Sequence, residues 1–70
     1  MTPTLLTFCD ERGDLRYVNL NNVEVIRFAN KPNIFTETMT VRYMSGEVIN
    51  YELRAEAGTA IKKKLNQFGL

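Results

Sequence analysis

The sequence contains no histidine and no tryptophan, and Cys9 is the single cysteine among its 70 residues. A disulfide needs two cysteines, and structural zinc sites are built from cysteine and histidine, so neither is available within the chain. The absence of histidine also removes the side chain that most often acts as an acid or base near neutral pH. Stability must therefore come from a hydrophobic core or from a partner subunit.

A strong charge of one sign and long apolar runs are missing as well. Nine basic residues stand against eight acidic ones, a net charge of +1, which creates no long-range field towards nucleic acid or an anionic membrane. The N-terminal stretch MTPTLLTF lacks the basic start and the long apolar segment of a signal peptide. We therefore expect a cytoplasmic protein that does not associate with membranes, and a single unpaired cysteine fits a reducing compartment.

The length allows one core, so we expect a single domain over residues 1–70. Alternating polarity and turn residues predict strands up to about residue 53. The expected strands are 5–9, 15–20, 23–28, 35–43 and 47–53. They are separated by turns at Gly13, at Asn21-Asn22 and at Ser45-Gly46, and by a loop around Pro32.

The pattern of apolar residues also predicts how the strands pair. In the first hairpin, a four-residue loop over 10–13 would place Phe8 opposite Leu15 and Leu6 opposite Tyr17. In the third strand the apolar residues change face, which a bulge near Val25 would allow.

The hairpin at Ser45-Gly46 has two possible registers. A two-residue turn would pair Tyr43 with Val48 and would put Asn50 on the apolar face. A three-residue loop over 44–46, with glycine left-handed at its last position, instead pairs Val41 with Ile49. Because a slip of one residue exchanges the two faces, burial favours the three-residue loop.

After residue 54 the apolar spacing changes to that of a helix. The apolar stripe consists of Ala57, Ile61, Leu65 and Phe68. It predicts a helix over about 55–68 that packs on one face of the sheet, anchored by Ile61 and Leu65. Gly58 lies inside this segment, so either the helix begins near Thr59 or it passes close to the sheet there. The expected fold class is α+β, with four to five antiparallel strands and one C-terminal helix.

Several segments together resemble a known family. They are Tyr17-Val18-Asn19-Leu20, Val23-Glu24-Val25-Ile26, Thr40-Val41 leading to Gly46, and the stripe that ends in Phe68. This pattern resembles short bacterial proteins typified by the flagellar FlbD family, and bacterial and phage proteins built as hairpins plus a terminal helix. The resemblance covers about residues 12 to 68 and implies the same α+β arrangement, without carrying over any functional residue.

Candidate catalytic groups are few, and each has an ordinary structural role. Ser45 is the sole serine and lies in a hairpin turn, and Cys9 has no cationic neighbour in sequence that would activate its thiol. The acidic residues Asp10, Glu11 and Asp14 share one short turn, where solvated carboxylates are common. The glycines stand singly, so no phosphate cradle is present. We expect no catalytic, cofactor or metal site, and hence no enzyme.

Two kinds of partner remain open. The first is another protein: Val18, Leu20 and Phe28 would leave apolar area on the face away from the helix, and an open sheet has unpaired edges. We therefore expect a non-catalytic protein–protein interaction module of unknown pathway, a homodimer or a subunit of a larger assembly, with these three residues at the interface.

The alternative partner is nucleic acid, bound by Lys62, Lys63 and arginines of the sheet. The sheet arginines are interspersed with aromatic residues, as in single-strand binders. However, consecutive helical residues are separated by about 100°, so Lys62-Lys63-Lys64 cannot form a single stripe along a phosphate backbone. Nucleic-acid binding is thus the second hypothesis.

Overall fold

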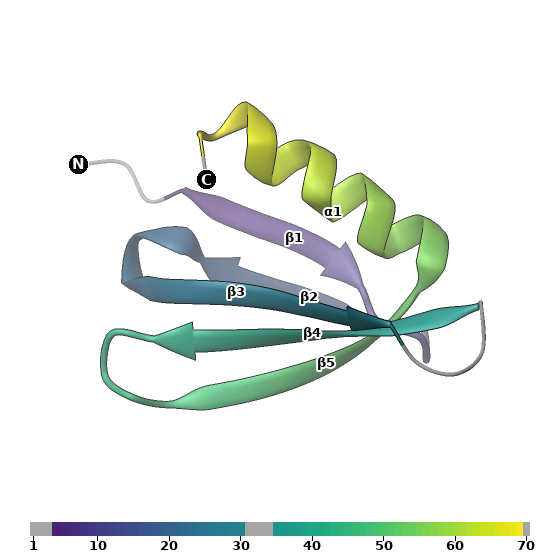
Figure 1. The fold of residues 1–70 in the computed structure, drawn as a ribbon, viewed down its shortest axis with the longest axis horizontal. Helices are drawn as coiled ribbons and strands as arrows, with labels where there is room; N and C mark the ends of the chain where they lie inside the picture. The colour runs from purple at the N-terminus through teal and green to yellow at the C-terminus, as the bar shows by residue number, and fades with distance from the viewer. Residues whose placement is uncertain (1–3, 31–34, 70) are drawn as a thin grey trace.

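The computed structural model describes residues 4–30 and 35–69, and its elements follow the expected order. They are β1 (Leu5–Cys9), β2 (Leu15–Asn19), a short 3-10 helix η1 (Leu20–Asn22), β3 (Val23–Asn30), β4 (Thr36–Tyr43), β5 (Val48–Arg54) and α1 (Ala55–Gln67). All strand pairings are antiparallel and the helix is C-terminal, which confirms the α+β class (Figure 1). The loop expected around Pro32 lies outside the described residues.

The five strands form two sheets rather than one. The β1–β2 hairpin is separate, and the second sheet has the order β3-β4-β5. Helix α1 contacts β1, β4 and β5, and it lies beside β1 in Figure 1. The hairpin and the helix together cover one face of the three-stranded sheet, which we call the inner face.

The core lies between the inner face and these two covering elements. Its nine buried apolar side chains are Leu6, Phe8, Val18, Leu20, Met39, Val41, Leu53, Ile61 and Leu65. The ring of Phe8 packs edge-on against Tyr51 of β5, with 5.1 Å between the centroids, and so joins the hairpin to the sheet. Each such apolar side chain contributes about 1.5–3 kcal/mol when fully buried.

The predicted helix over about 55–68 is confirmed, but Phe68, the last residue of the predicted apolar stripe, is not buried. Ile61 and Leu65 are buried, as expected. The helix begins at Ala55, so of the two alternatives for Gly58 the close approach to the sheet is the one that occurs. Phe68 is 48% exposed because the helix ends at Gln67, where the core has already ended.

The predicted details of β3, β4 and β5 are confirmed. The register shifts between Val23 and Val25, where the bulge was expected. Val41 lies opposite Ile49, and the Tyr43 amide donates a hydrogen bond of 2.8 Å to the carbonyl of Glu47. The loop over 44–46 ends in a glycine with a φ of 94°, a conformation in which a Cβ would be strained.

The predicted register of the first hairpin is wrong by one residue. Phe8 lies opposite Arg16 instead of Leu15. The Asp10 amide donates a hydrogen bond of 3.0 Å to the carbonyl of Asp14, which leaves a three-residue loop over 11–13. Its last residue is again a glycine with positive φ, here 87°, so both hairpins use the same kind of turn.

This register decides which side chains of the hairpin reach the core. Leu6 lies opposite Val18, and both point inward and are buried. Leu5, Leu15 and Tyr17 belong to the other face of the hairpin and are more than half exposed.

The three residues of the expected interface lie on the inner side of the chain, and Leu20, 9% exposed, belongs to the core. Val18 is 0% exposed within the single chain, so its side chain is not available to a partner. Phe28 lies opposite Met39, which places it on the inner face beneath the helix layer rather than on the face away from it. The reason is that the hairpin covers part of the inner face, so residues expected at an outer surface pack against the chain itself.

Candidate functional site

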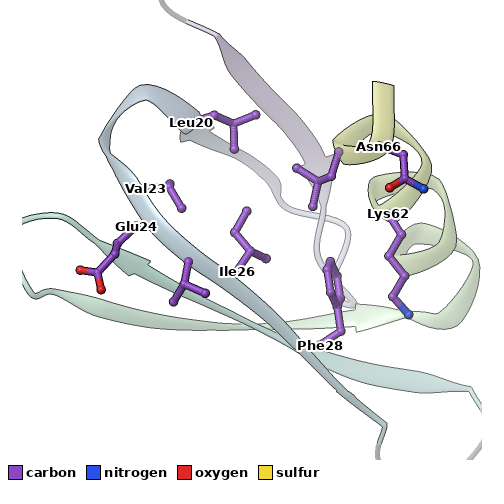
Figure 2. Close-up of a pocket in the computed structure, with 9 residues that line it drawn as sticks. Leu20, Val23, Glu24, Ile26, Phe28, Lys62 and Asn66 are labelled. Atoms are coloured by element: carbon purple, nitrogen blue, oxygen red, sulfur yellow. The ribbon is translucent and has the colours of Figure 1, made fainter. Parts of the chain in front are cut away.

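A groove runs between strand β3 and helix α1 and has a volume of about 430 Å³. Strand β3 lines one side with Val23, Glu24, Val25, Ile26 and Phe28, and helix α1 lines the other with Lys62, Leu65 and Asn66. Leu20 lies at one end of the groove, and Phe28 with Lys62 at the other (Figure 2). Most of these side chains are apolar, so the groove favours an apolar occupant.

The backbone of β3 forms one rim of this groove, because among the described strands β4 is its only partner. Three hydrogen bonds establish which residues of β4 face β3. The Tyr43 amide donates to the Glu47 carbonyl at 2.8 Å, and the Phe35 carbonyl accepts from the Ala55 amide at 2.9 Å. Both of these odd-numbered residues therefore bond towards β5. The Met44 amide donates to the Asn22 carbonyl at 2.8 Å, on the other side. Since bonding directions alternate along an antiparallel strand, the even-numbered residues of β4 bond towards β3.

The same alternation identifies the free groups on β3. The even-numbered residues of β4 lie opposite Val25, Arg27 and Ala29, so these three form the ladder to β4. The amides and carbonyls of Ile26 and Phe28 therefore point away from β4, along the open edge of the sheet. Among the described residues, no backbone hydrogen bond to another element satisfies them. The groove thus has an apolar lining and a row of unpaired backbone groups at its rim.

One end of the groove carries a compensated charge. The Lys62 ammonium lies 3.0 Å from the Glu37 carboxylate and 4.9 Å from the centre of the Phe28 ring. The Glu37 side chain is 6% exposed and that of Lys62 46%, so the carboxylate is buried and its partner reaches the surface. Because Glu37 neutralises Lys62, the groove offers little attraction for an anion.

Gly58 makes room for the buried carboxylate. A Cβ on this residue would overlap with the side chain of Glu37. Glycine is therefore required here, because helix and sheet approach each other closely. A glycine in a helix interior destabilises the helix by about 1 kcal/mol relative to alanine, and the contact with Glu37 explains why it is nevertheless present.

This cluster was not predicted from the sequence, although a signal for it exists. Glu37 has the same parity as the buried Met39 and Val41, so it stands at a core position of β4. A carboxylate at such a position needs a cation and space nearby. Gly58 and Lys62, one helical turn apart, supply both.

The acidic turn of the first hairpin has a structural role. Partial burial acts to raise the pKa of Asp10. Hydrogen bonds donated by the Asp14 amide, the Arg16 guanidinium and the Arg12 amide, each 3.0 Å long, outweigh it and hold that pKa below its usual value. The Asp10 carboxylate thus closes the turn. Within residues 4–30 and 35–69, no three acidic or cysteine side chains are grouped as metal ligands would be.

The other candidate groups lie apart from the groove. Cys9 is exposed in β1, and the Ser45 hydroxyl accepts a hydrogen bond of 3.4 Å from the Glu47 amide within its turn. Burial, together with the neighbouring Tyr51 hydroxyl and the Glu47 carboxylate, raises the pKa of Tyr43 to about 12.

The basic residues of the nucleic-acid hypothesis are divided between two sides of the molecule. Arg27, Arg42 and Arg54 share the outer face of the three-stranded sheet, opposite the core. Lys62 lies at the groove on the inner side and is paired with Glu37. The aromatic residues Phe28 and Tyr51 also belong to the inner side, so the outer arginines have no stacking platform among these rings.

No protein-family model matches the sequence, and no curated protein or solved structure matches it either. The resemblance to the flagellar family consequently stays a prediction. In the described part of the chain, no helix has the length and apolar character needed to cross a membrane.

Proposed function

We propose that this protein is a non-catalytic protein–protein interaction module that binds an extended segment of a partner as an additional strand on β3. The observation that carries the proposal is the coincidence of two features at one place. The unpaired backbone groups of Ile26 and Phe28 lie along the same groove that the apolar side chains line. Backbone hydrogen bonds would supply affinity, and alternate side chains of the partner would enter the groove.

The chemistry of the groove supports a peptide backbone as ligand over a charged small molecule. Lys62, the one cation among the described residues that line it, is neutralised by Glu37, and the lining includes Leu20, Ile26 and Leu65. A strand that bonds to β3 would also remove the exposed sheet edge, which is otherwise a site of unwanted association. We place this binding in the cytoplasm, where an exposed thiol such as that of Cys9 stays reduced.

Amide hydrogen exchange of the full chain tests this proposal, because the two sets of amides alternate along β3. Peptides selected from a random displayed library would serve as probes. Binding should slow exchange at Ile26 and Phe28, whereas Arg27 and Ala29, already bonded to β4, serve as internal controls and should change little. Protection that appeared instead at Leu15 and Tyr17 of the hairpin would move the binding surface away from β3 and contradict the proposal.

A further inference from the structure

We infer that the strand received by β3 is the β3 strand of a second copy of this chain, paired antiparallel about a two-fold axis at Ile26. The inference rests on the proposed function and names its partner. The product would be one continuous sheet of six strands, in which the two β3 strands lie at the centre and no β3 edge remains open.

The backbone restricts the possible arrangements to three. In an antiparallel pair, the outward groups of one strand must meet the outward groups of the other, and in β3 these belong to Ile26, Phe28 and Asn30. A two-fold axis near the middle of the strand can then pass through Ile26, through Arg27 or through Phe28. Each choice places different residues opposite one another.

The charges on β3 select among these arrangements. An axis through Arg27 would set that residue directly opposite its own copy, and like charges in this position are destabilising. An axis through Phe28 would set Ile26 opposite Asn30 and would carry Arg27 away from the partner's Glu24. The first alternative therefore opposes two like charges, and the second forms no pair between Glu24 and Arg27.

An axis through Ile26 produces a self-complementary pattern. Arg27 then lies opposite the partner's Val25. Glu24, the residue before Val25, lies opposite the partner's Phe28 and diagonal to the partner's Arg27. Glu24 is the extra residue of the bulge, and both it and Arg27 are exposed. Neither has an ion-pair partner among the described residues of its own chain, so the two-fold axis would create two Glu24–Arg27 pairs between copies.

The apolar side chains agree with the same arrangement. Ile26 and Phe28 are only half-buried in the single chain, although both point to the inner face. Around the axis the two Ile26 side chains would meet, flanked on each side by a Phe28 ring. The partner strand would therefore cover the apolar lining that the chain's own helix leaves open, which gives the groove an occupant of matching polarity.

Cysteine cross-linking tests the position of the axis, because each arrangement predicts a different variant. In a Cys9→Ser background, the variants are Ile26→Cys, Arg27→Cys and Phe28→Cys. Residues directly opposite in an antiparallel pair have Cα atoms about 5.5 Å apart at hydrogen-bonded positions such as Ile26 and Phe28, and about 4.5 Å apart at non-hydrogen-bonded positions such as Arg27. Both spacings are within the Cα range of a disulfide. We expect a covalent dimer on mild oxidation for Ile26→Cys alone. Cross-linking of either other variant in its place would overturn the inferred axis.

Charge reversal tests the ion pairs without touching the core. Sedimentation equilibrium should show that Glu24→Arg and Arg27→Glu each weaken the dimer about 5- to 20-fold, since each removes two exposed pairs and adds repulsion. The double variant should return to within about twofold of the wild-type dissociation constant. Glu11→Arg, the same charge change in an exposed turn away from β3, is the matched control and should leave the constant unchanged. Failure of the double variant to recover would contradict the pairing.

Strand addition on β3 and its occupation by a second copy can be contradicted separately. A wild-type protein that stays monomeric at every attainable concentration, with no cross-link at any of the three positions, overturns the inference of a second copy. If library peptides still protect the Ile26 and Phe28 amides in that case, strand addition on β3 stands. If they do not, the proposed function falls as well.

Discussion

Replacing Gly58 with alanine should destabilise this protein, although alanine is the better helix former. In an unhindered helix interior the substitution would stabilise by about 1 kcal/mol. Here the new Cβ would overlap with the Glu37 carboxylate, which is buried and accepts a 3.0 Å hydrogen bond from Lys62. Overpacking costs about 1–3 kcal/mol, and displacing the ion pair, whose lysine is half-exposed, adds up to about 1 kcal/mol. After the gain of about 1 kcal/mol from helix propensity is subtracted, we expect the free energy of unfolding to fall by up to about 3 kcal/mol.

A double-mutant cycle separates this steric cause from helix propensity. In a Glu37→Ala background the space beside Gly58 is empty, so Gly58→Ala should now stabilise by up to about 1 kcal/mol. In a Glu37→Gln background the amide keeps the size of the carboxylate and loses its charge. The substitution should remain destabilising there, because the overlap is steric.

Urea unfolding followed by circular dichroism measures each corner of the cycle, provided that the m-value stays constant. If Gly58→Ala stabilised the wild-type chain, the Glu37 carboxylate would not occupy the space beside the helix, contrary to the expectation. A destabilisation of equal size in the Glu37→Ala background would refute it too, because the cost would have some other origin.

Four further outcomes are expected. Ile61→Ala should lower the free energy of unfolding by about 2–5 kcal/mol, whereas Phe68→Ala, at a half-exposed site, should lower it by about 1 kcal/mol or less; equal effects in urea unfolding would mean that the helix is wrongly placed. Asp10→Asn should destabilise at neutral pH. Because folding lowers the pKa of Asp10, the difference from wild type should begin to shrink as the pH falls below about 4, the unfolded-state pKa, and should vanish only below the lower pKa of the folded state. Folding raises the pKa of Tyr43, so wild-type stability should decline as the pH rises from 10 towards 12, and Tyr43→Phe should lessen that decline in alkaline urea titrations. Mixed-sequence DNA should show no saturable change in fluorescence anisotropy at low salt, because the basic side chains lie on opposite sides of the sheet; tight, strongly salt-dependent binding would contradict this.

The two hairpins show where sequence alone is sufficient. In strands β4 and β5 the apolar residues other than Val48 occupy one parity, as with Val41 and Ile49. Only one register buries them, so the three-residue loop could be predicted. In strand β1, Leu5 and Leu6 are adjacent and have opposite parity, and the same holds for Tyr17 and Val18 in β2. Either register of the first hairpin would bury some apolar side chains, so burial could not select between them, and the predicted register was wrong by one residue.

The amino-acid pattern by itself determined the order of the strands and the helix, the bulge at Val25 and the burial of Ile61 and Leu65, because these depend on local periodicity. The groove depends on long-range packing. The positions of the hairpin and α1 on the sheet decide which part of β3 stays partly open. The ion pair of Glu37 with Lys62 likewise joins residues 25 positions apart in the sequence. Periodicity predicts which side chains are buried. The open backbone edge at Ile26 and Phe28, in contrast, exists because the assembled hairpin and helix leave it uncovered.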